Sequence, residues 1–268
     1  RSTGAPIFSR LAQRAGVPST NSWAGRLWGR GRGWQPRARN RPMIKYIGSK
    51  RALLPLIVET ISGVARAERD SVAGCDAEGE GGSAGTVLDL FSGTSRVGHA
   101  LKGAGYRVLA NDHNAYAATL ARCYVHADAE DVLVDAARLV DEFNARLRSG
   151  WSEPGYFTET FCERSRYFQP RNGARIDAIR EAIAAMGLGP DLEAVMLVSL
   201  MEAADRVDST TGLQMAYLKD WAPRSFKDLE LRVPDVLARA ACGKGSATCL
   251  DAFEAAATLE ADIAYIDP

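Results

Sequence analysis

The chain has 268 residues, of which 46% are hydrophobic and 25% charged, and its 33 basic residues balance 33 acidic ones. This profile is typical of a globular protein with a sizeable core and excludes a disordered or fibrous chain. No run approaches the roughly 18 apolar residues of a membrane span, and the N-terminus lacks the apolar core of a signal peptide, so we predict a cytoplasmic protein without a membrane partner.

Cysteine and histidine are too sparse to indicate a metal site. The five cysteines contain no Cys-x-x-Cys pair, and the three histidines, His99, His113 and His126, lie far apart in the sequence. Neither a disulfide framework nor a zinc site is indicated. We therefore predict chemistry without a metal ion.

The balanced charge hides an asymmetry between the first residues and the rest. Residues 1–42 hold nine arginines and no acid, so the other 24 basic residues face 33 acidic ones. Such a split can mark an arm that binds nucleic acid. This stretch is rich in Gly, Pro and Ser and precedes the first methionine, Met43. We expect it to be a disordered tail outside the working protein.

From Met43 the sequence alternates between helix and strand patterns. Apolar residues from Leu53 to Ile61 recur at helical spacing, with Ser49 placed to cap the helix, and a glycine-rich connection follows over 71–85. Residues 86–91 predict a strand, which is followed by a Ser-Gly-Thr-Ser turn and a helix through Leu101.

Residues 106–110 predict a second strand, followed by a helix through Tyr124. This alternation indicates the first half of a doubly wound α/β sheet. Strand patterns return at 247–250 and 263–266. Between them, residues 127–240 break the alternation with helical patterns over 132–147, 176–186 and 192–204, the last apolar nearly all round. We interpret 127–240 as a helical insert in a catalytic domain made of 43–126 and 241–268.

Four aspartates stand at or near the predicted strand ends: Asp89, Asp112, Asp251 and Asp267. An isolated strand-end aspartate is most often a turn former or a helix cap. However, ligands of parallel sheets bind beyond the carboxyl ends of the strands, and Gly93 lets the backbone approach one closely. Asp112 lies 19 residues beyond Gly93, where nucleotide-binding folds place a carboxylate that accepts hydrogen bonds from ribose hydroxyls. Ser95 stands where a second early glycine is usual.

Four motifs, in this order, resemble those of adenine-specific DNA methyltransferases of the DNA adenine methylase type: Ile44-Lys45-Tyr46-Ile47-Gly48-Ser49-Lys50, Asp89-Leu90-Phe91-Ser92-Gly93-Thr94, Asn111-Asp112-His113-Asn114 and Ile266-Asp267-Pro268. The resemblance spans Met43 to Pro268. It implies a Rossmann-like α/β sheet that binds S-adenosylmethionine, with a helical insert for target recognition.

The resemblance also implies roles for individual residues. Tyr46 and Lys50 would contact S-adenosylmethionine, although core packing and a solvated lysine are the simpler interpretations. Asp112 would hold the ribose and Asp251 would lie near the cofactor's adenine. The remaining cofactor contacts would come from the first strand and its turn, at Asp89, Phe91, Ser92 and Gly93.

Asp267 and Pro268 look like the opening of the family's Asp-Pro-Pro-Tyr motif, which is truncated here. An adenine amino group is a poor nucleophile because its lone pair is delocalised into the ring. A carboxylate and a backbone carbonyl that accept its two N–H hydrogens raise its reactivity, so positioning supplies most of the catalysis. Asp267 would be the carboxylate and the Pro268 region the backbone acceptor.

The insert would hold double-stranded DNA. Its segment 163–175 contains four arginines and the pair Tyr167-Phe168. Arginines bind phosphates or guanine, and aromatic rings stack on bases, although a solvated face over buried aromatics fits the pattern nearly as well. The polar segment 208–214 is a second candidate. The predicted DNA contacts are Arg164, Arg166, Arg171 and Arg175.

The sequence thus predicts an S-adenosylmethionine-dependent methyltransferase that modifies the N6 amine of adenine in DNA, of the kind found in restriction-modification systems. Two alternatives remain: a methyltransferase acting on RNA, and a DNA- and cofactor-binding remnant without turnover. The truncated motif favours the remnant for this fragment.

Overall fold

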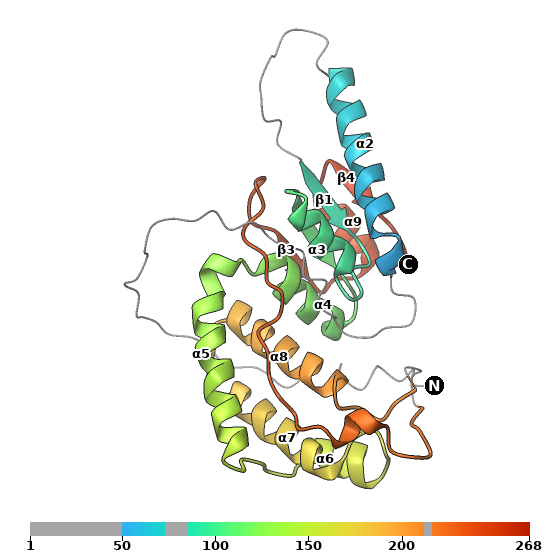
Figure 1. Ribbon diagram of the computed structural model, residues 1–268. Helices are drawn as coiled ribbons and strands as arrows, with labels where there is room; N and C mark the ends of the chain where they lie inside the picture. The colour runs from blue at the N-terminus through green and yellow to red at the C-terminus, as the bar shows by residue number, and fades with distance from the viewer. Residues whose placement is uncertain (1–49, 73–84, 212–215) are drawn as a thin grey trace.

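The computed structural model describes residues 50–72, 85–211 and 216–268. Within these, a small parallel sheet with flanking helices lies next to a group of helices (Figure 1). Several predictions lie outside the described residues: the tail over 1–42, Tyr46, the helix cap at Ser49 and most of the connection over 71–85.

All four predicted strands form, and they pair in the order β3-β2-β1-β4 with every neighbour parallel. β1 ends at Asp89, two residues earlier than predicted, because Leu90 and Phe91 already belong to the turn that follows. The α/β class predicted from the sequence is confirmed. The strands are β1 (Thr86–Asp89), β2 (Arg107–Asn111), β3 (Ser246–Thr248) and β4 (Ile263–Tyr265).

Helices cover both faces of the sheet. One face packs against α2 (Leu54–Val72) and α3 (Arg96–Gly103), and the other against α9 (Ala252–Thr258). Successive strand residues point to opposite faces, so Val87 joins the cluster under α3 while Leu88 joins the one under α9. A strand buried on both faces is apolar throughout, which is why the pattern was readable in the sequence.

The helix predicted to run through Tyr124 has two parts. The α-helix α4 (Ala115–Ala121) continues as a π-helix, η2 (Arg122–His126). Leu120 of α4 packs in the core of the insert, and Val125 of η2 packs in the core of the sheet. This continuous segment therefore joins the two cores.

The insert is built from helices with one core of its own. The helix α8 is buried almost all round, as predicted. The helix α7 begins at Pro170, so half of the predicted basic segment 163–175 is helical. After η4 (Pro223–Phe226) the chain runs back along the insert to β3 (Figure 1). The other elements of the insert are α5 (Ala129–Arg148), α6 (Tyr156–Thr158), the π-helix η3 (Glu159–Glu163), α7 (Pro170–Ala185) and α8 (Pro190–Asp205).

Candidate functional site

The carboxyl ends of the four strands form the candidate site. β1 lies between β2 and β4, so the chain moves outward from β1 to one side and later returns on its other side. Open α/β sheets bind their ligands in the crevice at this point. The four predicted aspartates lie at this edge: Asp89 ends β1, and Asp112, Asp251 and Asp267 follow β2, β3 and β4.

The turn after β1 is tied to the strands on both sides. The N–H of Leu90 donates to the Tyr265 carbonyl at 3.2 Å, and that of Ser92 donates to the Asn111 carbonyl at 2.8 Å. Gly93 and Ser95 both have left-handed backbone, at φ 50° and 57°. Serine therefore keeps the conformation of the usual glycine, at a cost of roughly 1–2 kcal/mol.

Asp112 is joined to this turn through its carboxylate. One oxygen, Oδ2, accepts the Gly93 N–H at 2.9 Å, and the other, Oδ1, accepts the Asn114 N–H at 2.9 Å. Each carboxylate oxygen has a second lone pair, so both retain capacity for a ligand hydroxyl. This geometry is compatible with the ribose contact predicted for Asp112.

Asn111, the first residue of the third motif, is a positioning residue whose role the sequence did not predict. Its side-chain amide donates to the carbonyls of Leu90 at 3.3 Å and Leu250 at 3.2 Å. Its side-chain oxygen accepts from the Thr248 hydroxyl at 2.8 Å and the Leu250 N–H at 3.1 Å. One side chain therefore fixes the turns after β1 and β3 against each other.

Asp89 lies beneath α3 and is 1% exposed. Neither of its carboxylate oxygens has a hydrogen-bond partner of normal geometry within the described residues. Burial raises its pKa from 3.8 to about 7; the nearby Gly98 N–H opposes this rise, and the charge of Asp112 adds to it. The buried hydroxyls of Ser92 and Ser95 also lack partners in this part of the chain.

Such a cluster of unsatisfied buried groups is unusual in a folded protein. It surrounds one turn, next to the carboxylate of Asp112, whose two oxygens keep lone pairs for a ligand. A cationic ligand with hydroxyl and ammonium groups fits this donor and acceptor set, and S-adenosylmethionine is such a ligand.

Two side chains contact the carboxylate of Asp267, which follows β4. Lys50, in the short 3-10 helix η1 (Lys50–Ala52), forms an ion pair with it, and the Tyr265 hydroxyl donates to its Oδ2 at 2.7 Å. The structure thus places Lys50 beside the predicted catalytic carboxylate, and that carboxylate follows the strand adjacent to β1. Pro268 comes directly after it.

Asp251 lies further out, after the edge strand β3. It is exposed, and its Oδ1 accepts the Phe253 N–H at 2.9 Å, which caps α9. The simpler interpretation of a strand-end aspartate therefore holds for one of its oxygens. Phe253 itself is 88% exposed, so an aromatic ring stands free beside Asp251. The sequence analysis missed this ring because exposure of one residue in an apolar stretch depends on tertiary packing.

The predicted DNA-contacting arginines lie on one side of the insert but differ in their partners. Arg164 pairs with Glu159, Arg175 bonds to Asp228 at 2.7 Å, and Arg171 lies 3.5 Å from the same carboxylate. Arg166 instead donates to the Lys219 carbonyl at 2.7 Å and stacks over the Trp221 ring at 4.7 Å.

The aromatic pair in this segment is part of the core. Tyr167 and Phe168 are both buried and pack with Phe161 and Phe157, so the stacking role considered for them is wrong. Their hydrophobic area is needed to close the small helices α6 and η3 onto α7.

The described residues show neither a metal-binding cluster nor a membrane-spanning helix. In residues 50–72, 85–211 and 216–268, no group of three or more His, Cys, Asp or Glu side chains is arranged to hold a metal ion. Among the helices in those ranges, none is long and apolar enough to cross a membrane.

The parallel sheet, the glycine turn after β1 and the acid after β2 define a protein with a Rossmann-like α/β fold. Comparison with known proteins narrows this class. Residues 46–268 match the model of the D12 class N6 adenine-specific DNA methyltransferase family, and the chain belongs to this family.

Curated relatives agree with the family. Over 84% of this chain, it is 29% identical to the type II methyltransferase M.NlaIII of Neisseria lactamica and 28% identical to M.CviAII of Paramecium bursaria Chlorella virus 1. It is also 28% identical to the modification methylase StsI of Streptococcus sanguinis, again over 84% of the chain. The chain spans 64%, 63% and 33% of these relatives, respectively. No solved structure matches it.

Proposed function

We propose that the full-length protein transfers a methyl group from S-adenosylmethionine to the N6 amine of adenine in double-stranded DNA. The observation that carries this proposal is the pair of adjacent features at the strand ends. Buried groups without hydrogen-bond partners and the carboxylate of Asp112 lie after β1 and β2, and the oriented carboxylate of Asp267 lies after β4. Family membership supports the reaction type.

In this proposal the residues after β1 and β2 bind and orient the cofactor. Asp112 accepts ribose hydroxyls, while the groups around the turn, Asp89, Phe91, Ser92 and Gly93, surround its methionine part. Asp251 and the exposed ring of Phe253 face its adenine. The bound cofactor supplies an electrophilic methyl group on a sulfonium sulfur. Tyr46 remains a proposed contact.

Asp267 is the proposed catalytic residue. Lys50 and Tyr265 fix the direction of its carboxylate, which leaves lone pairs free to accept an amino N–H. With the backbone acceptor near Pro268, this arrangement localises the nitrogen lone pair toward the methyl donor. Preorganised acceptors of this kind act without a metal or a covalent intermediate.

The insert is proposed to hold the DNA. Arg164, Arg166 and Arg171 are exposed on it, and Arg175 shares the carboxylate of Asp228 with Arg171. Of the second predicted DNA segment, 208–214, residues 212–214 lie outside the described residues; Thr210 pairs with Tyr217 in a short bridge, and Arg166 donates to the nearby Lys219 carbonyl. The names of the relatives support a place in restriction-modification, and we propose the cytoplasm as the location.

The test uses labelled S-adenosylmethionine, full-length protein, and matched duplex DNA and RNA. We expect N6-methyladenine in DNA and none in RNA. Asp267→Asn should abolish transfer and leave cofactor affinity unchanged, whereas Asp112→Ala should weaken cofactor binding by about 1–3 kcal/mol in calorimetry. Asp141→Ala on the exposed face of α5 is the control. Label in RNA would support an RNA methyltransferase, and binding of both ligands without transfer would support a remnant.

A further inference from the structure

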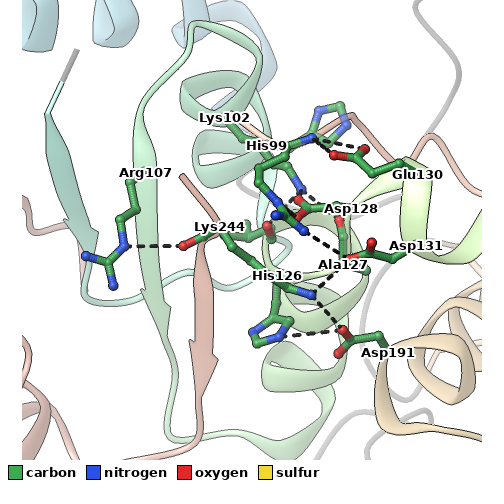
Figure 2. Close-up of polar contacts among 12 residues, drawn as sticks. His99, Lys102, Arg107, His126, Ala127, Asp128, Glu130, Asp131, Asp191 and Lys244 are labelled. Carbon is green, nitrogen blue, oxygen red and sulfur yellow. Dashed lines mark hydrogen bonds and ion pairs between the residues drawn. The ribbon is translucent and has the colours of Figure 1, made fainter. Parts of the chain in front are cut away.

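The chain crosses between the sheet and the insert twice, and one buried lysine lies at the first crossing. Lys102 on α3 is almost fully buried. Its ammonium group donates to the carbonyls of Val125 at 3.0 Å and Ala127 at 2.7 Å, and to Asp128 Oδ1 at 2.8 Å (Figure 2). All three N–H bonds of the ammonium are therefore satisfied by the segment that leads from η2 into α5.

Asp128 connects this crossing to the second one. It is 0% exposed, and its other oxygen accepts from Arg239 Nε at 2.7 Å, on the segment that returns to β3. Burial opposes the charged form of Asp128, but the hydrogen bonds from Lys102 and Arg239 outweigh it and lower the pKa. Asp128 stands at the N-cap of α5 yet makes no side-chain cap bond. Its carboxylate is used for the two cations instead.

A second layer of ion pairs surrounds these three residues. Arg239 also lies 3.3 Å from Asp131, and Lys244 lies 3.2 Å from Asp131 and 3.3 Å from Asp191. The Ala129 N–H donates to the Leu237 carbonyl at 2.9 Å. Thus the start of α5, the start of α8 and the returning segment are joined at one place.

The helix α3 links this place to the proposed cofactor pocket. It begins directly after Ser95 of the turn and reaches Lys102 within two turns, while Val97 and Leu101 anchor it on the sheet. Its His99 also contacts the Asp235 carbonyl at 2.8 Å, on the returning segment. One short, rigid helix therefore touches the pocket at one end and both crossings at the other.

Stability alone does not require charges here. Well-packed apolar residues often replace a buried ion pair without loss of stability, whereas directional bonds select one relative orientation of the groups they join. The three partners come from three separate segments, α3, the start of α5 and the returning segment. This arrangement restrains rotation and sliding of the insert about its two connections.

We propose that Lys102, Asp128 and Arg239 form an interdomain clamp that sets the position of the DNA-holding insert relative to the cofactor pocket. They are positioning residues, and the inference rests on the proposed function. Loosening the clamp leaves the pocket intact but misplaces the target base. A displacement of about 1 Å can cost about 100-fold in rate.

The test compares Arg239→Gln and Lys102→Met with Arg138→Gln in full-length protein. Arg138 is an exposed arginine whose ion pairs lie within α5, so it controls for loss of charge. Spin labels at Val134→Cys on α5 and Val64→Cys on α2 report the distance between the two parts, with Cys75, Cys242 and Cys249 replaced by serine. Both label sites are exposed.

We expect a narrow distance distribution in wild type and Arg138→Gln, and a broader one in Arg239→Gln. The rate constant for methyl transfer should fall about 10- to 100-fold in that variant. Its cofactor Kd should stay within about twofold of wild type, which a general loss of structure would not allow. Arg239 is half-exposed, so this variant should fold even if Lys102→Met does not.

An unchanged distance distribution in folded Arg239→Gln would overturn the clamp. The distance measurement does not depend on turnover. If wild type transfers no methyl group, the proposed function fails, whereas the distance distributions still decide whether these residues fix the insert.

Discussion

Asp89 is a buried carboxyl group whose ionisation destabilises the folded protein. Its carboxyl group is buried without a hydrogen-bond partner of normal geometry in the described part of the chain, and its pKa is raised to about 7. The folded state therefore binds this proton more tightly than the unfolded chain does. Stability from this group is greatest below about pH 4 and is lost as the pH rises to about 7.

Asp89→Asn should remove this dependence. We expect the free energy of unfolding to fall between pH 5 and pH 8 in wild type, by about 3 kcal/mol at most, and to fall much less in the variant. Urea denaturation at pH 5 and at pH 8 measures the free energy of unfolding. Ser92→Ala, which alters a neighbouring hydroxyl and no titratable group, should keep the wild-type dependence. Equal slopes for wild type and Asp89→Asn would refute the assignment.

At the same scale, the sequence located the acids but not what surrounds them. The position of Asp112 at a strand end followed from an apolar run ending in polar residues. The ion pair of Lys50 with Asp267 did not, because its members are more than 200 residues apart and meet only through the order of the strands. The exposure of Phe253 and the four bonds of Asn111 were hidden for the same reason.

Helices and strands could be predicted from the sequence where a buried face required apolar residues at regular spacing. They were harder to predict where contacts between backbone segments decide the local structure. The strands and α8 were found from their apolar runs. The π-helix η2 was not, since its side chains also fit an ordinary helix. The sheet order was equally unreadable, because it depends on β3 and β4 adding to opposite edges.

Gly245, just before β3, illustrates packing of backbone against backbone. A Cβ there would lie 2.7 Å from the Val108 carbonyl oxygen and 3.1 Å from that of Val125. Neither carbonyl can move without disturbing β2 or η2. Gly245→Ala should therefore destabilise the protein by about 1–3 kcal/mol, as other overpacked sites do.

The matched control is Gly63→Ala in α2, where an added Cβ meets nothing within 4 Å. This change should stabilise the protein by up to about 1 kcal/mol through helix propensity. Urea denaturation midpoints of both variants decide the matter. The change from glycine to alanine is expected to lower the free energy of unfolding at Gly245 and to raise it at Gly63. Destabilisation by both variants would contradict the packing explanation.

At the scale of the whole molecule, the net charge after residue 42 opposes binding to DNA, the proposed partner. Residues 43–268 carry 24 basic and 33 acidic residues, so general attraction to a polyanion is unfavourable. DNA affinity of this part must come from a local surface. The proposed surface lies on the insert at Arg164, Arg166 and Arg171, and Arg166 contacts the Lys219 carbonyl and the ring of Trp221. Only tertiary packing distinguishes these arginines from Arg175, whose side chain is 19% exposed and bonded to Asp228.

Because of this difference in exposure, replacing Arg166 and replacing Arg175 should have different effects. Arg166→Ala in full-length protein should weaken DNA binding and lower the slope of log K against log salt by about one, because one phosphate contact is lost. Arg175→Ala should lower the melting temperature and change that slope little, because its ion pair joins α7 to the returning segment. Fluorescence anisotropy over a salt series measures both slopes, and Arg138→Ala corrects for net charge. If Arg166→Ala keeps the wild-type slope, DNA must bind elsewhere, and the second predicted segment, 208–214, becomes the stronger candidate.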